Sequence, residues 1–286
     1  MCRVFVLGDE WLYFKIYLGK ESFDRLLLTC VLPLSEKLLC AKTISEFFFI
    51  RYEDSFGAHL RVRFHVSDLK SITYAISEIN HCFKPLIETR RIKNLVFDSY
   101  IRELERYGER NYHLTESIFC VDSVCQLHLL KAIKNYQNDN YRWMIGLVLV
   151  DDLLSIFNIK GEQYLSFVER HRDAYRYEYQ CMDKRIRQKH NDHYRKNLSE
   201  IESALNRKFP KEIKSILNAR KGKISSLYND MIGASSDNQD SYWGSIIHMT
   251  VNRFFEDSAR VCEMALYEFL FKHKRSEIKR LSIVKS

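Results

Sequence analysis

The sequence has few residues that break regular structure, with only three prolines and nine glycines among 286 residues. This scarcity argues against a loop-rich or disordered chain. No apolar run approaches the length of a membrane span, and the N-terminus lacks the apolar core and cleavage site of a secretory signal. Hydrophobic residues make up 46% of the chain and aromatic residues 13%, so a sizeable core can form. These features predict a globular protein of the cytoplasm.

Several motifs of catalysis and metal binding are also missing. The eight cysteines include no CxxC pair, which predicts reduced, mostly buried thiols instead of a disulfide framework or a zinc site. The ten histidines show no HExxH spacing, and the chain has no glycine-rich phosphate loop and no GxSxG nucleophile elbow. A metal ion, a nucleotide cofactor and a covalent nucleophile all lack support, and we expect no cofactor.

The hydrophobic periodicity predicts strands first and helices later. The expected strands lie at residues 11–18, 47–51, 59–64 and 95–100, with a loop over 52–58. The first expected helices cover residues 22–39, capped by Ser22, and 67–83, capped by Ser67. Helices dominate from residue 112 onward and end with a long helix over 245–273 and a frayed basic tail. This order favours one α+β domain over residues 1–286, with a small antiparallel sheet in the N-terminal half packed against a predominantly helical remainder.

Strict alternation marks the strand expected near residue 60. One face would carry Leu60, Val62 and Phe64, and the other His59, Arg61, Arg63 and His65. Arg51 ends the preceding strand. Because arginine binds carboxylate or phosphate through two parallel hydrogen bonds, the polar face is a candidate anion site. A half-exposed strand with solvated arginines explains the pattern equally well.

Two further pairs are candidates for chemistry. Glu103 and Arg106 are three residues apart and would share a face of a helix, although an ordinary surface ion pair has the same spacing. His248 and Asn252 are one helical turn apart. An imidazole beside an amide is typical of an acid/base residue, whereas a satisfied core histidine is the simpler interpretation.

The positive charge is concentrated in residues 169–223, where sixteen Lys and Arg face eight Asp and Glu. This surplus equals the whole net charge of +8. Such a segment can attract nucleic acid or an acidic peptide, but a solvated helical face is the simpler interpretation. No nucleic-acid-binding module is visible.

Six stretches in a fixed order resemble the C-terminal domain of class I lantibiotic dehydratases, which also occurs alone as the thiopeptide-type bacteriocin biosynthesis protein. The stretches are residues 11–20, 48–54, 59–64, 100–108, 116–123 and 245–254, with further matches at 23–27 and 263–267. The chain departs from the family pattern at three places. Residues 55–58 lack the usual proline turn, Glu109 stands where a second glycine is common, and Thr250 and Val251 replace a His-Cys pair.

The resemblance implies glutamate elimination. A separate glutamyl-tRNA-dependent protein first esterifies Ser or Thr of a leader-bearing precursor peptide with glutamate. The domain then removes the α-proton and expels glutamate, leaving dehydroalanine or dehydrobutyrine. The implied catalytic residues are His248, Glu103 and Arg106, and the implied substrate-binding residues are Arg61, Arg63, Arg51 and Asn252. The expected partners are the precursor peptide and the glutamylating protein. A homodimer is compatible with the sequence, whereas direct tRNA binding is not expected.

Two other functions remain open. Relatives of the same fold include thiopeptide pyridine synthases, which join two dehydroalanines in a formal [4+2] cycloaddition and release the leader peptide. The combination of Arg61, Arg63, Glu103, Arg106 and His248 favours elimination over this reaction. The third reading is a non-catalytic subunit that binds peptide or tRNA through the basic segment 169–223.

Overall fold

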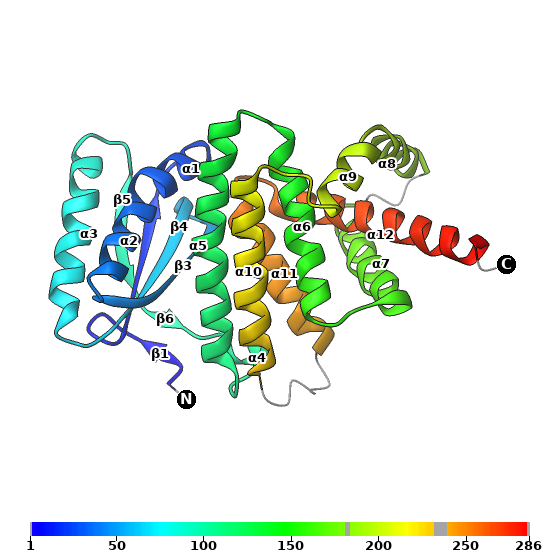
Figure 1. The fold of residues 1–286 in the computed structure, drawn as a ribbon. Helices are drawn as coiled ribbons and strands as arrows, with labels where there is room; N and C mark the ends of the chain where they lie inside the picture. The colour runs from blue at the N-terminus through cyan, green and yellow to red at the C-terminus, as the bar shows by residue number, and fades with distance from the viewer. Residues whose placement is uncertain (1, 181–183, 232–238, 285–286) are drawn as a thin grey trace. The chain divides into compact units, whose positions relative to one another are not determined.

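A computed structural model describes residues 2–180, 184–231 and 239–284. Contacts group the chain into two compact units, and each is considered by itself: unit 1 comprises residues 1–131 and 229–233, and unit 2 the remainder. All strands of the described chain lie in unit 1, and the regular structure of unit 2 is helical (Figure 1). The predicted α+β class is confirmed. The single domain over residues 1–286 stays a prediction.

The main sheet of unit 1 has four antiparallel strands in the order β3-β4-β2-β5. Their bounds are β2 Trp11–Tyr17, β3 Ile44–Asp54, β4 Gly57–Val66 and β5 Asn94–Asp98. A second sheet pairs β1, Val4–Phe5, with β6, Tyr100–Ile101. The short ribbon matters for the site because β6 leads directly into Glu103 and Arg106.

One face of the main sheet forms the core of unit 1. Leu60, Val62 and Phe64 of β4 are fully buried there, as the alternation predicts. The helices of unit 1 are η1 Lys20–Ser22, α1 Phe23–Leu26, η2 Leu27–Val31, α2 Leu32–Cys40, α3 Ser71–Glu88, α4 Leu104–Tyr107 and α5 Tyr112–Tyr136, whose last five residues belong to unit 2. Apolar residues of α1, η2, α2 and α3 cover this face (Figure 1). The opposite face is therefore the one that carries Arg61 and Arg63.

The expected loop over residues 52–58 is wrong, because β3 and β4 form a tight hairpin with only Ser55 and Phe56 between the strands. Asp54 accepts a hydrogen bond from the Phe56 N–H at 2.9 Å. Gly57 has φ of 123°, a conformation that favours glycine. A short turn of Asx type and a glycine therefore allow the strands to extend almost to the tip.

The helix starts expected at Ser22 and Ser67 also differ from the structure. Ser22 makes no capping hydrogen bond, and the helix that follows is interrupted by the π-helical turn η2. The second helix begins only at Ser71. Asp68 accepts hydrogen bonds from the Ser71 N–H at 3.0 Å and its hydroxyl at 3.1 Å. The carboxylate thus satisfies an N–H at the start of the helix, the role that we had assigned to Ser67.

Unit 2 is built from helices around α6, whose residues Ile145 to Val150 are all buried. The helices are α6 Asn140–Ile156, α7 Gly161–Glu178, α8 Lys184–Lys196, α9 Leu198–Leu205, α10 Lys211–Asn229, α11 Gln239–Phe254 and α12 Ala259–Val284. A helix that is apolar on every side must be covered on every side, which explains its central place.

The single final helix expected over residues 245–273 is wrong, because α11 ends at Phe254 and α12 begins at Ala259. Ser258 has φ of 52°, a left-handed conformation that a right-handed helix cannot continue. Arg142 of α6 donates its Nε–H to the Phe254 carbonyl at 3.1 Å and satisfies the end of α11. The basic tail that we expected to be frayed is helical through Val284.

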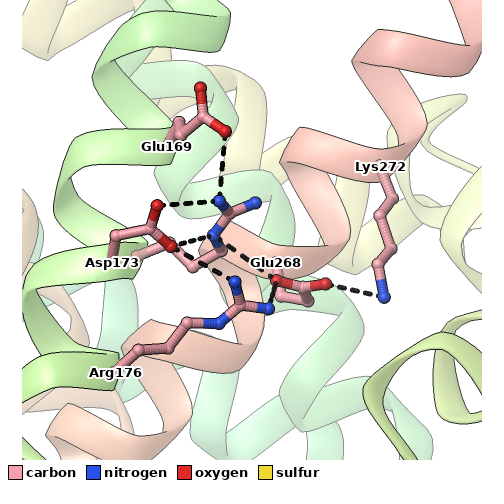
Figure 2. A network of polar contacts seen from close by, with 6 residues as sticks. Glu169, Asp173, Arg176, Glu268 and Lys272 are labelled. Atoms are coloured by element: carbon pink, nitrogen blue, oxygen red, sulfur yellow. Dashed lines mark hydrogen bonds and ion pairs between the residues drawn. The ribbon is translucent and has the colours of Figure 1, made fainter. Parts of the chain in front are cut away.

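A network of ion pairs joins α7 to α12 (Figure 2). Arg176 donates to Glu268 Oε2 at 2.7 Å, and Lys272 lies 2.6 Å from Glu268 Oε1. Asp173 accepts from both Arg172, at 2.8 Å, and Arg176, at 3.2 Å. Arg172, Arg176 and Glu268 are buried, so each charge needs the opposite charges around it. Part of the positive surplus of segment 169–223 therefore stabilises the interior of unit 2 and is not available to a partner.

The cysteines differ from the expectation of mostly buried thiols. The seven in the described chain are free, and of these only Cys125 is buried, whereas Cys2 and Cys40 are exposed. The described residues contain no group of three or more His, Cys, Asp or Glu side chains arranged to hold a metal ion. In the same part of the chain, no helix is both long and apolar enough for a membrane crossing.

Candidate active site

Arg63 lies on the polar face of β4, inside a cage of aromatic rings. Its guanidinium carbon is 4.4 Å from the ring centre of Tyr13, 4.7 Å from that of Tyr100 and 5.0 Å from that of Phe48. Tyr13 and Phe48 are its neighbours in register on β2 and β3. The faces of aromatic rings attract a cation, so this cage holds the guanidinium in place after most of its water has been removed.

The Arg63 cage leaves hydrogen-bond donors unused. The residue is only 8% exposed, and within the described residues its Nε and Nη1 atoms are buried without a hydrogen-bond partner. Aromatic rings stabilise the charge but accept no strong hydrogen bonds, and leaving buried donors unpaired is costly. A carboxylate placed in the guanidinium plane would satisfy two N–H groups at once. Arg63 is therefore the strongest candidate anion-binding group of unit 1.

Arg61 follows on the same face. Its guanidinium stacks 3.5 Å from the ring centre of Tyr52, and its Nε–H donates to His59 Nε2 at 3.2 Å. His59 is fully buried, and burial lowers the pKa of its imidazole. His59 thus serves as a neutral acceptor for Arg61, not as the additional cation that the alternating pattern had suggested.

Arg51 lies on the other face of the sheet. It pairs in register with Leu60, a core residue, and its Nη2 donates to Asp24 Oδ1 at 2.6 Å. The register therefore separates Arg51 from Arg61 and Arg63, and we leave it out of the candidate anion site. The run Phe47-Phe-Phe-Ile-Arg51 does not alternate, so its sequence gave no indication of which side Arg51 would take.

Glu103 and Arg106 form the expected pair, with Arg106 Nη1 donating to Glu103 Oε2 at 3.3 Å. Both side chains are largely exposed, at 61% and 41%. Glu103 is the residue before α4 and not part of the helix, and its backbone N–H donates to the Tyr112 hydroxyl at 3.0 Å. The pair is thus present on the surface of unit 1, and its position depends on the buried groups beneath it.

Those buried groups centre on Glu116, which the sequence analysis did not single out. Arg102 donates to both of its oxygens, from Nε at 2.9 Å and from Nη2 at 2.5 Å. The Tyr100 hydroxyl donates to Glu116 Oε1 at 2.7 Å. Burial, followed by the charge of Glu116, raises the pKa of Tyr100 well above its usual range, so the hydroxyl stays a donor. Glu116 therefore fixes one wall of the Arg63 cage and the backbone that precedes Glu103.

The predicted histidine, His248, lies on α11 of unit 2 beside a buried carboxylate. Its Nδ1 is 2.8 Å from Glu263 Oε2 of α12, and the Tyr175 hydroxyl of α7 donates to the same oxygen at 2.8 Å. Burial, then the charge of Glu263, raises the pKa of Tyr175, which therefore remains a phenol. Because a carboxylate only accepts, Nδ1 carries a proton, and in the neutral ring Nε2 is then the nitrogen with the lone pair. Asn252 lies one turn further along the same helix.

The candidate residues are divided between the two units. Arg61, Arg63, Glu103 and Arg106 belong to unit 1, and His248 and Asn252 to unit 2. Sequence reasoning missed Glu263 and Tyr175, although residues 263–267 are among the stretches of the resemblance. The available signal was an acidic residue within the apolar run 261–271 of α12, where Glu263 is buried in the structure.

A protein-family model described as the C-terminal part of lantibiotic biosynthesis dehydratases matches residues 11–274. The chain belongs to this family. Among curated members related to it, the nisin biosynthesis protein NisB of Lactococcus lactis subsp. lactis is 36% identical over 132 residues. That match covers 46% of this chain but only 13% of NisB. This dehydratase-family chain therefore corresponds to a small part of a much longer relative.

Two solved structures share the fold of this lantibiotic dehydratase family member. The tRNA-dependent lantibiotic dehydratase MibB from Microbispora sp. 107891 matches with a TM-score of 0.75 and 19% identity, over 96% of this chain and 28% of MibB. The pyridine synthase TbtD from thiomuracin biosynthesis matches with a TM-score of 0.66 and 14% identity, over 96% of this chain and 100% of TbtD. At these identities the matches establish the fold alone.

Proposed function

We propose that this chain removes glutamate from glutamylated Ser and Thr side chains of a ribosomal precursor peptide, leaving dehydroalanine or dehydrobutyrine. Membership of the dehydratase family supports a role in dehydration. The observation that carries the proposal is Arg63, a caged and buried guanidinium with unpaired N–H groups. The leaving group of the reaction is a carboxylate, which is the ligand that such a group fits.

The elimination breaks two bonds, Cα–H and Cβ–O, and forms two, the bond from the base to the proton and the second bond between Cα and Cβ. A base takes the α-proton of the esterified residue, the electron pair forms the double bond between Cα and Cβ, and the Cβ–O bond breaks. Its electrons go to the departing carboxylate of glutamate. Negative charge therefore develops on oxygen atoms, and donors placed at that point stabilise the transition state. We assign this task to Arg61 and Arg63, with Arg106 as a further cation oriented by Glu103.

His248 is the candidate for proton transfer. Its Nδ1 is held by Glu263, which orients the ring and stabilises the imidazolium that forms when Nε2 takes a proton. Tyr175 holds the same carboxylate oxygen from α7. Asn252 shares the helix and is assigned to substrate binding.

The reaction also implies partners. As the source of the ester we propose a glutamylating protein that uses glutamyl-tRNA, because Arg63 and His248 offer no chemistry for acyl activation. The substrate is a precursor peptide with its leader, and the proposed compartment is the cytoplasm. Neither direct tRNA binding nor a homodimer is required by this chemistry.

One observation favours a second function. The pyridine synthase TbtD shares the fold of this chain, with a TM-score of 0.66. A cycloaddition between two dehydroalanines followed by release of the leader peptide is therefore the alternative reaction. It expels no glutamate and gives the unpaired Arg63 no carboxylate to bind.

The test is to incubate the protein with a glutamylated precursor peptide and to follow the peptide by mass spectrometry. We expect loss of glutamate and formation of dehydrated residues, and no such loss with His248→Ala or Arg63→Met. Arg25→Met, an exposed substitution on α1, is the matched control and should react as the wild type does. A macrocycle formed from a pre-dehydrated peptide, without glutamate release from the ester, would establish the cycloaddition instead.

A further inference from the structure

We propose that His59 is a positioning residue, whose neutral ring holds Arg61 in the orientation that binds a carboxylate. The importance of this orientation for catalysis rests on the proposed function of Arg61. The coupling between the two side chains does not, since it follows from the geometry of β4 alone. His59 touches no substrate in this proposal and acts only through Arg61.

The partners of His59 determine its protonation. Its Nδ1 lies 3.1 Å from the Gly57 carbonyl oxygen, which can only accept, so Nδ1 carries a proton. Its Nε2 receives the Nε–H of Arg61 at 3.2 Å, and arginine can only donate. Nε2 must therefore present a lone pair. Both contacts exist together only for the neutral Nδ1–H form of the ring.

Aromatic neighbours hold this arrangement rigid. The ring centres of Tyr17 and Tyr52 lie 4.6 Å and 5.5 Å from that of His59, and the histidine is fully buried. Tyr52 also supports the Arg61 guanidinium at 3.5 Å. Among the described residues, Nε is the only side-chain nitrogen of Arg61 in a hydrogen bond. With its face on Tyr52 and its Nε on His59, Arg61 has its two terminal nitrogens left for a carboxylate.

Three strands supply the charged groups around His59. Asp54 of β3 lies 3.9 Å from Nδ1 and accepts the Tyr17 hydroxyl of β2 at 3.1 Å. Asp54 favours the protonated ring, whereas Lys15 of β2 and Arg61 of β4 oppose it. Burial is the largest effect, and it lowers the pKa of His59. Acidification below that pKa places a proton on Nε2, removes the only acceptor of the Arg61 Nε–H and releases the arginine.

The coupling can be tested without any substrate. In protein with isotope-labelled arginine, the Nε–H resonance of Arg61 is assigned by its loss in Arg61→Lys. We expect this resonance to be shifted and protected from exchange in the wild type and in His59→Gln, whose side-chain carbonyl can replace Nε2 as acceptor. His59→Phe keeps the ring but removes the acceptor and should abolish the protection. His65→Phe, on the same face of the same strand, should leave the resonance unchanged.

The effect on the site is measured with L-glutamate, the product of the proposed reaction. We expect His59→Phe to weaken glutamate binding by about tenfold, the size of one lost hydrogen bond to a charged group, and His59→Gln to restore most of it. Glutamate binding by the wild type should also fall on acidification, in parallel with the Arg61 resonance. Because that titration uses only the wild type, it tests the coupling between His59 and Arg61 even if His59→Phe does not fold.

The two proposals fail in different ways. If neither His59→Phe nor acidification changes the shift and the exchange protection of the Arg61 Nε–H resonance, the positioning role is wrong. This conclusion does not depend on the result of the glutamate-binding measurement. If the resonance responds as expected and the wild type does not bind glutamate, His59 does position Arg61, and the proposed elimination is what fails.

Discussion

At the scale of single residues, the contacts of His248 explain how one imidazole can take part in a proton transfer. Glu263 is 1% exposed, and its carboxylate accepts hydrogen bonds from both His248 and Tyr175. A buried carboxylate with two donors stays in place, and it fixes which ring nitrogen faces away from it. The His248 side chain itself is 21% exposed, so the imidazole is not closed off from solvent.

Replacing this carboxylate by an amide tests the arrangement. Glu263→Gln keeps the size of the side chain but lets it donate to His248, which favours the wrong tautomer. We expect glutamate release from a glutamylated peptide to slow by about a hundredfold, within the usual range for loss of acid/base catalysis. Tyr175→Phe, which removes one donor and leaves the tautomer unchanged, should cost no more than about tenfold. Equal rates for Glu263→Gln and the wild type would show that His248 needs no orienting group.

The placement of some of these residues could be predicted from the sequence, whereas the partners of His248 could not. Arg61 and Arg63 could be placed on one face because the alternation of a strand is local. Glu263 could not be paired with His248, since the two are fifteen residues apart on different helices and the break between these helices was not predicted. Tyr175 lies 88 residues from Glu263, and no local pattern links them.

At the scale of elements, the buried pair of Arg102 and Glu116 ties the end of β6 to α5. Arg102 also donates to the Cys2 carbonyl at 2.9 Å, so the same guanidinium holds the segment before β1. Tyr100, on β6, reaches Glu116 and borders the Arg63 cage. The ordering of these elements therefore depends on one carboxylate that is 2% exposed.

Glu116→Gln is accordingly expected to destabilise unit 1 strongly. The change leaves Arg102 buried with no opposite charge, a situation that costs roughly 3–5 kcal/mol in proteins. The matched control is Glu53→Gln, which breaks the exposed pair with Lys20 and should cost at most about 1 kcal/mol. Urea unfolding of both variants measures the difference. Similar losses for the two substitutions would mean that the buried pair does not anchor β6.

The existence of most strands and helices was predicted more accurately than their ends, for a physical reason. Strands and long helices were found because their apolar periodicity reports which side is buried. Their ends depend on single contacts, such as Asp68 at the start of α3 and Arg142 at the end of α11. The chain reverses after α11 without proline or glycine, through Ser258, so the usual signals of a break were absent.

At the scale of the whole molecule, buried histidines give both units the same response to acid. Burial is the largest cause of a lowered pKa for His59 in unit 1 and for His171 and His273 in unit 2. Below the pKa of about 6.5 of an unfolded histidine, the unfolded chain binds protons that the folded chain does not. Stability contributed by these neutral rings is therefore complete above about pH 6.5 and is lost as the pH falls toward the lowered pKa of each.

The thermal midpoint should consequently decrease when the pH is lowered from about 7.5 to about 5.5, while the carboxylates of typical pKa are still ionised. Asp151 acts in the opposite sense, because burial raises the pKa of its carboxyl and protonation relieves a buried charge. Its destabilising effect is relieved as the pH falls from this raised pKa toward the ordinary pKa of an aspartate, about 3.9. His59→Gln removes one titrating group, so the midpoint of this variant should vary less with pH than that of the wild type. An identical pH dependence in His59→Gln and the wild type would contradict the lowered pKa of His59.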